Sequence, residues 1–117
     1  MTVTLETITP PDTGMLSLDL RLTADIRITP DHARRSVSQF VGNHIADLLH
    51  GERPDLIIRA DGAYWRVPVV LSSRSLGRIG VVGSLDVDVN SGDLNMSERT
   101  IAEIERNAQR FASGAAL

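Results

Sequence analysis

A regular alternation of apolar and polar residues between Met15 and Ile28 constrains this chain more than any other feature. From Leu16 onward every even position is apolar, and from Ser17 onward every odd position is polar or charged. A period of two places all the apolar side chains on one face of an extended strand. We therefore predict a β-strand over residues 15–28, in an antiparallel sheet that has one face in water.

The period changes from two to 3.6 directly after this strand. Thr29-Pro30-Asp31 is typical of a helix start, with a capping hydroxyl, a proline in the first turn and a carboxylate near the positive end of the helix dipole. The apolar stripe that follows stops before Gly51 and Pro54. This predicts a helix over residues 30–50, packed on one face of the sheet. We interpret Gly42 inside it as a place where another backbone approaches closely.

Three further runs indicate strands over residues 55–60, 63–72 and 78–89. The Asp61-Gly62 pair between the first two is a strong hairpin signal. In the second run Trp65 takes an inward position and should anchor the core. Pro68 cannot donate to a strand ladder, which limits how centrally that strand can lie.

A second amphipathic helix is predicted over residues 96–112, covering a sheet edge or a partner. With 117 residues the chain is long enough for one domain. The expected organisation is a flexible N-terminal arm (1–14), a single α+β domain (15–113) with an antiparallel sheet of about four strands, and a frayed C-terminus (114–117).

The composition excludes several chemistries. The chain holds 12 Lys+Arg, all of them Arg, against 15 Asp+Glu, for a net charge of -3, and it has no Cys. Lysine Schiff-base chemistry and thiolate catalysis are therefore excluded, and a general nucleic-acid binder is disfavoured. The start of the chain has no targeting pattern and no apolar run is long enough for a membrane span, so we expect a cytoplasmic protein that does not enter a membrane.

Groups that could carry chemistry are scarce. Asp86, Asp88 and Asn90 have the alternate spacing of a calcium loop, but the glycine and the final acidic residue of that loop are missing. His32 and His44, like His50, lack the spacing of a metal pair. The glycines at 77, 80 and 83 precede another strand, which is not the setting of a phosphate-binding loop. We predict no catalytic residue, no metal and no cofactor.

Two surfaces are candidates for contact with other molecules. One is the narrow apolar seam of the C-terminal helix, formed by Ile101, Ile104, Ala108 and Phe111. The other is a polar patch formed by Arg74, Arg78, Asp86 and Asp88.

The stretch from Ile28 to Leu94 resembles a PepSY-like module. The resemblance is carried by the helix after Thr29-Pro30, by Ala63–Val69 (AYWRVPV) and by Leu85–Leu94 (LDVDVNSGDL). It implies a helix packed on an antiparallel hairpin, in modules that are usually exported and that inhibit or regulate peptidases without catalytic residues of their own. The segments Trp65–Val69 (WRVPV) and Asp86–Val89 (DVDV) also resemble those of small bacterial proteins.

Together these observations predict a non-enzymatic protein-binding or regulatory module that forms a homo-oligomer, through a sheet edge or through the apolar seam. Two alternatives stay open. One is a labile partner of a toxin or regulator encoded beside it. The other is a small metal-dependent enzyme or ligand-binding protein that uses Asp86 and Asp88.

Overall fold

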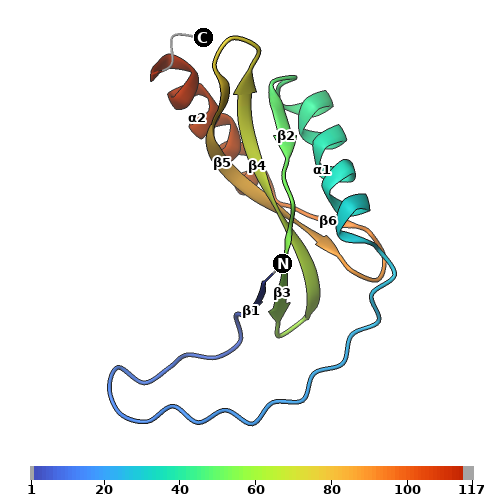
Figure 1. The fold of residues 1–117 in the computed structure, drawn as a ribbon, viewed down its shortest axis with the longest axis vertical. Helices are drawn as coiled ribbons and strands as arrows, with labels where there is room; N and C mark the ends of the chain where they lie inside the picture. Colours follow the sequence, from blue (N-terminus) through green and yellow to red (C-terminus); the bar gives the residue numbers. More distant parts are fainter. Residues whose placement is uncertain (1, 115–117) are drawn as a thin grey trace.

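The computed structural model describes residues 2–114 and shows two helices and a mixed sheet, the α+β class predicted (Figure 1). The strand order is β1-β3-β4-β5-β6, and β2 also pairs with β4. The sheet is not purely antiparallel, because β1 runs parallel to β3. In chain order the elements are β1 (Val3–Leu5), α1 (Pro30–His44), β2 (Leu49–Gly51), β3 (Asp55–Arg59), β4 (Gly62–Ser73), β5 (Gly77–Asp88), β6 (Leu94–Asn95) and α2 (Glu98–Gly114).

A long hairpin of β4 and β5 forms the centre of the sheet. Its strands match the predicted ranges 63–72 and 78–89 to within one residue at each end, and β3 matches the predicted strand over 55–60. Two register shifts interrupt the β4–β5 ladder, one after Val69 and one after Leu71. Each leaves one extra residue on β5, and such bulges increase the twist of the strands.

Pro68 lies in β4, which has strand neighbours on both edges, so the prediction that it keeps this strand near the sheet edge is wrong. Its carbonyl oxygen accepts a hydrogen bond from the Glu52 amide at 2.9 Å, so its nitrogen faces that neighbour too. There residues 52–54 separate β2 from β3. The nitrogen of Pro68, which has no hydrogen to donate, therefore faces the gap between β2 and β3, where the ladder of hydrogen bonds is interrupted.

Helix α1 begins as predicted, with the Thr29 hydroxyl accepting a hydrogen bond from the His32 amide at 3.0 Å. It ends at His44, so the predicted extension to residue 50 is wrong. Leu49 continues the helical stripe in sequence, but it pairs with Leu71 as part of β2 instead. The free edge of β4 offers this segment a ladder of hydrogen bonds, which overrides its helical pattern.

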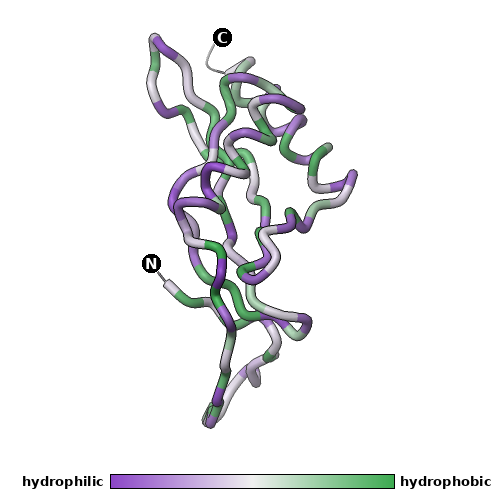
Figure 2. Tube along the Cα trace, turned by 90° about the vertical axis from the view of Figure 1, so that its right-hand side faces the viewer, coloured by the Kyte–Doolittle hydropathy of each residue, from purple (hydrophilic) through white to green (hydrophobic). Residues whose placement is uncertain are grey.

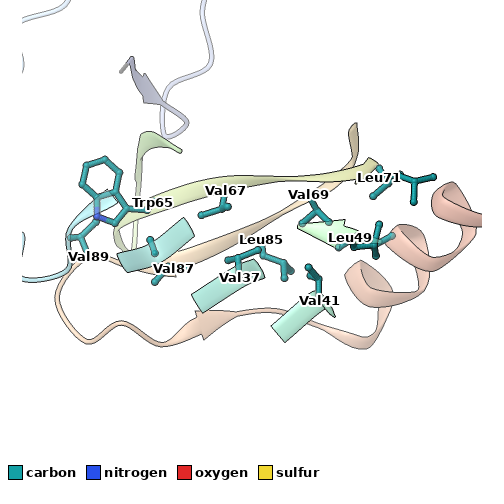
Figure 3. Close-up of a cluster of buried hydrophobic side chains, with 13 residues drawn as sticks. Val37, Val41, Leu49, Trp65, Val67, Val69, Leu71, Leu85, Val87 and Val89 are labelled. Carbon is teal, nitrogen blue, oxygen red and sulfur yellow. The ribbon is translucent and has the colours of Figure 1, made fainter. Parts of the chain in front are cut away.

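The core lies between α1 and the β4–β5 hairpin (Figure 3). Trp65 is 2% exposed and donates its indole N–H to the Ile28 carbonyl at 2.7 Å. This confirms its predicted role as an inward anchor. The other buried side chains of the cluster are Ala33, Val37, Val41, Leu49, Val67, Val69, Leu71, Val82, Leu85, Val87, Val89 and Ile104.

Helix α2 lies alongside β5 (Figure 1). Ile104 packs onto Gly83, where a Cβ would stand only 2.7 Å from Ile104 Cγ1. Asn107 donates its side-chain amide to the Val82 carbonyl at 2.9 Å, so the helix satisfies a backbone acceptor of β5. The helix therefore covers part of the sheet edge with both apolar and polar contacts.

The close approach expected at Gly42 occurs at Gly51 instead. A Cβ on Gly42 would have Leu49 O as its nearest neighbour at 3.9 Å, which is ordinary contact. In β2, by contrast, Gly51 donates its amide to Ser38 Oγ at 2.8 Å and lies directly under α1. The interpretation of Gly42 is therefore wrong.

We expect Gly51→Ala to lower the free energy of unfolding by about 2 kcal/mol, since overpacked cores shift at that cost. Its Cβ would lie 2.7 Å from Val67 Cγ1 and 3.0 Å from the Arg34 carbonyl oxygen. Gly42→Ala is the matched control and should raise stability by up to about 1 kcal/mol, the helix propensity difference. Urea titration measures both. If both substitutions lowered the free energy of unfolding, or both raised it, the close packing at Gly51 and the open surroundings of Gly42 would be contradicted.

The largest departure from prediction is the segment over residues 15–28, which is extended but belongs to no strand. The predicted flexible arm, residues 1–14, in turn contains β1, which pairs with β3. Of the predicted frayed end, Gly114 closes α2, and residues 115–117 lie outside the described part of the chain.

Candidate functional site

Residues 15–28, here called the extended segment, are held to the body of the protein at their C-terminal end. The amides of Arg27 and Ile28 both donate to the Val89 carbonyl at 2.9 Å, and Asn90 Nδ2 donates to the Asp25 carbonyl at 3.4 Å. The indole N–H of Trp65 donates to the Ile28 carbonyl at 2.7 Å. The segment therefore leaves the sheet from a fixed point beside the end of β5.

The rest of the extended segment stands away from the sheet (Figure 1), and Figure 2 shows it edge-on at the bottom of the molecule. Its apolar side chains are about half exposed even though their spacing is that of a strand with a buried face. The exposed fractions are 52% for Leu16, 50% for Leu18, 50% for Leu20, 58% for Leu22 and 48% for Ile26.

Such a segment presents two unsatisfied features together. Within residues 2–114, the backbone groups of residues 15–24 form no ladder with another strand. Aliphatic side chains in a row also favour removal from water, at roughly 25 cal/mol per Å². Pairing with another strand gives the backbone groups hydrogen-bond partners and covers the apolar side chains. A free strand can therefore lead to aggregation or serve to bind a partner.

A second candidate site is the ion-pair network on the face of the sheet opposite α1. Arg66 on β4 lies opposite Asp86 on β5 and contacts it through Nε at 2.9 Å and Nη2 at 3.0 Å. Arg59 Nη1 contacts the same carboxylate at 3.2 Å. The Asp86 side chain is only 9% exposed. Both of its oxygens are therefore engaged by guanidinium groups.

Glu6, just after β1, extends this network. Arg66 donates to its two carboxylate oxygens at 2.9 and 3.2 Å. These hydrogen bonds lower the pKa of Glu6 against the opposing effect of burial. Hydrogen bonds to Asp86 and then to Glu6 raise the pKa of Arg66 above its already high value. The network joins the edge strand β1 to the central hairpin.

A polar hollow of about 460 Å³ lies between this network and α2. The helix contributes Thr100, Glu103 and Asn107 to its lining, and β5 contributes Ser84 and Asp86. In this hollow the Asp86 carboxylate is paired with Arg59 and Arg66, and its contact with Arg66 joins β4 to β5.

The predicted polar patch is not one site. Arg78 pairs with Glu52 at 2.9 Å near the start of β5. Asp86 lies far along the same strand: the β4 partners of Arg78 and Asp86, Ser72 and Arg66, are six residues apart, about 20 Å at the rise of a strand. Arg74 is in the β4–β5 turn. Asp88 accepts the amides of Asn90 and Ser91 at 2.8 and 3.0 Å, which lowers its pKa and stabilises the predicted turn.

The predicted apolar seam faces the protein's own sheet. Ile104 is 1% exposed, and Ile101, Ala108 and Phe111 are half-buried against the core, with Phe111 over Gly80. These side chains already have partners within the chain. The extended segment, which sequence reasoning placed inside the sheet, is the larger accessible apolar surface.

The histidines do not converge. His32 and His44 are exposed on α1, and His50 lies in β2. Within the described residues no group of three or more His, Asp or Glu side chains is placed to hold a metal ion. Nor does any helix of residues 2–114 have the length and apolar character needed to cross a membrane.

Comparison with models of known protein families, with curated proteins and with solved structures yields no match. The resemblance of residues 28–94 to a PepSY-like module therefore stays a prediction.

Proposed function

We propose that this protein is a non-catalytic protein-binding module that associates with a second copy of itself through the extended segment. The observation that carries the proposal is a strand-patterned segment whose apolar side chains are about half exposed. Covering them requires another surface, and pairing with a strand of another chain supplies one.

The charges of the extended segment favour a second copy as that partner. Its polar face carries Asp19, Arg21, Asp25 and Arg27, two of each sign. A surface with both signs in alternation can be complementary to itself, as a two-fold symmetric interface requires. A segment of one sign would repel its own copy.

The polar face of the sheet supports a binding role rather than a catalytic one. Asp86 accepts from two guanidinium groups, and Asp88 accepts from two backbone amides. These carboxylates, which carried the enzymatic alternative, are engaged in holding strands and a turn together.

Analytical ultracentrifugation at micromolar concentration should find a dimer. Leu20→Asp should shift it to monomer while leaving the circular dichroism and the thermal midpoint nearly unchanged, since Leu20 is 50% exposed. Leu76→Asp is the control: Leu76 is 56% exposed in the β4–β5 turn, so the same substitution there should leave the dimer intact.

A monomer at every concentration up to 100 µM would overturn the proposal. So would a dimer that both leucine variants leave unaltered, because the extended segment would then play no part in it.

A further inference from the structure

We infer that two copies pair through their extended segments as antiparallel strands centred on Thr23, so that Thr23 faces Thr23 of the second copy. This inference rests on the proposed function and specifies its interface. It follows from the side-chain pattern, the charge order and the direction of the backbone groups in the segment.

The side-chain pattern restricts the possible registers. A sheet pair keeps its apolar faces together only when even residues lie opposite even residues, since a shift by one turns every side chain to the other face. Two-fold symmetry then makes residue 23 + n face residue 23 - n of the second copy, if Thr23 is the centre. Each other centre defines a competing register.

The charge order selects among these registers. With Thr23 at the centre, Asp19 faces Arg27 and Arg21 faces Asp25, and symmetry repeats both pairs. Opposite charges across a strand pair attract, and like charges repel. All charged residues of the polar face are thus matched across the pair, with Arg27 exchanging its present 2.8 Å contact to Asp25 of its own chain for Asp19 of the second copy.

The neighbouring registers place like charges opposite each other or leave charges without a partner. A centre at 22 sets Asp19 against Asp25, and a centre at 24 sets Arg21 against Arg27. Centres at 21 and 25 set a charged residue against its own copy. A centre at 20 makes only the Asp19–Arg21 pair. Parallel pairing in register sets each charge against itself.

The backbone leaves the required edge free. The Asp25 carbonyl and the Arg27 amide both point to the protein's own body, where they meet Asn90 and Val89. The Ile28 amide also meets Val89, so the alternation of backbone groups ends at the bend there. Before this bend the backbone groups of an extended chain alternate between its two edges, so those of the even residues 18–26 point outward. Thr23 and its copy would form a non-hydrogen-bonded pair, with Cα atoms about 4.5 Å apart.

Cysteine cross-linking tests the centre directly, since the chain has no cysteine of its own. Thr23→Cys should oxidise to a covalent dimer, because about 4.5 Å suits a disulfide. Ser17→Cys is the matched control: it is equally exposed but would lie about 40 Å from its copy, twelve residues away along the strand, and should not cross-link.

Charge reversal tests the register independently. Arg21→Asp should raise the dimer Kd about tenfold or more, by turning two attractive pairs into repulsive ones. Arg21→Asp with Asp25→Arg should restore it to within about threefold, because the pairs are then reversed rather than lost. Arg74→Asp, in the exposed β4–β5 turn, makes the same change in net charge and should leave Kd unaltered.

The two levels of inference fail differently. A dimer that Leu20→Asp dissociates, but in which Ser17→Cys cross-links as well as Thr23→Cys or the double charge variant is not restored, overturns the register alone. A monomer overturns both the register and the proposed function.

Discussion

The substitution Ile104→Asp is expected to unfold the protein rather than to separate two copies. Ile104 is 1% exposed and is packed against Gly83, so the new carboxylate would be buried where an aliphatic side chain now packs. Burying an unpaired charge is among the few changes that cost more than about 4 kcal/mol. Urea titration followed by the fluorescence of Trp65, the single tryptophan, measures the loss.

Ala102→Asp is the matched control on the same helix. Ala102 is exposed, so its substitution should change stability by about 1 kcal/mol or less. A folded Ile104→Asp variant with near-normal stability would contradict the packing of Ile104 on α2 against β5. Because this variant is expected to unfold, it cannot serve as a test of dimerisation, and the exposed Leu20 is the appropriate site.

Arg66→Met is expected to lower the free energy of unfolding by about 3 kcal/mol, in the range measured when one partner of a buried ion pair is removed. The reason is the carboxylate that stays behind: the Asp86 side chain, 9% exposed, would keep only Arg59 at 3.2 Å. Glu6 would also lose its contact to β4. Thermal or urea unfolding measures the effect.

Two companion variants distinguish the effect of leaving the buried Asp86 carboxylate unpaired from the effect of removing one positive charge. Arg78→Met breaks the exposed Arg78–Glu52 pair, which has similar geometry, and should have a much smaller effect. Adding Asp86→Leu to Arg66→Met should recover at least half of the loss, because no buried charge is then left unpaired. Equal losses in Arg66→Met and Arg78→Met would show that burial of Asp86 is not the cause.

Local patterns predicted the central hairpin and its turns well. The strands around Trp65 and Leu85 alternate strongly, and Asp61-Gly62 marks the turn between β3 and β4. The start of α1 was predicted equally well, because Thr29 and Pro30 act within one helical turn. In each case the decisive interactions join residues close together in the sequence.

The Arg66–Asp86 pair could not be predicted in this way. The β4–β5 turn pairs Ser73 with Gly77, and counting back from it without interruption would set Arg66 opposite Ser84. The two bulges each add a residue on β5 and shift the partner to Asp86. A bulge depends on how the strands twist and pack, which the alternation of residues does not record.

The end of α1 shows the same limit. Leu49 fits the helical stripe as well as it fits a strand. It lies in a strand because the open edge of β4 pairs with it at Leu71. A pattern of apolar residues predicts which face of an element is buried, but it does not predict which other element of the fold buries it.

The sequence by itself determined that residues 15–28 have one apolar and one charged face, since side-chain direction alternates in any extended chain. Only the tertiary structure decided that this segment stays outside the sheet. Strand pairing needs a free edge within reach, but β2 and β3 occupy the outer edge of β4, and β6 and α2 lie along β5. Val89 and Trp65 fix only the C-terminal end of the segment to the hairpin.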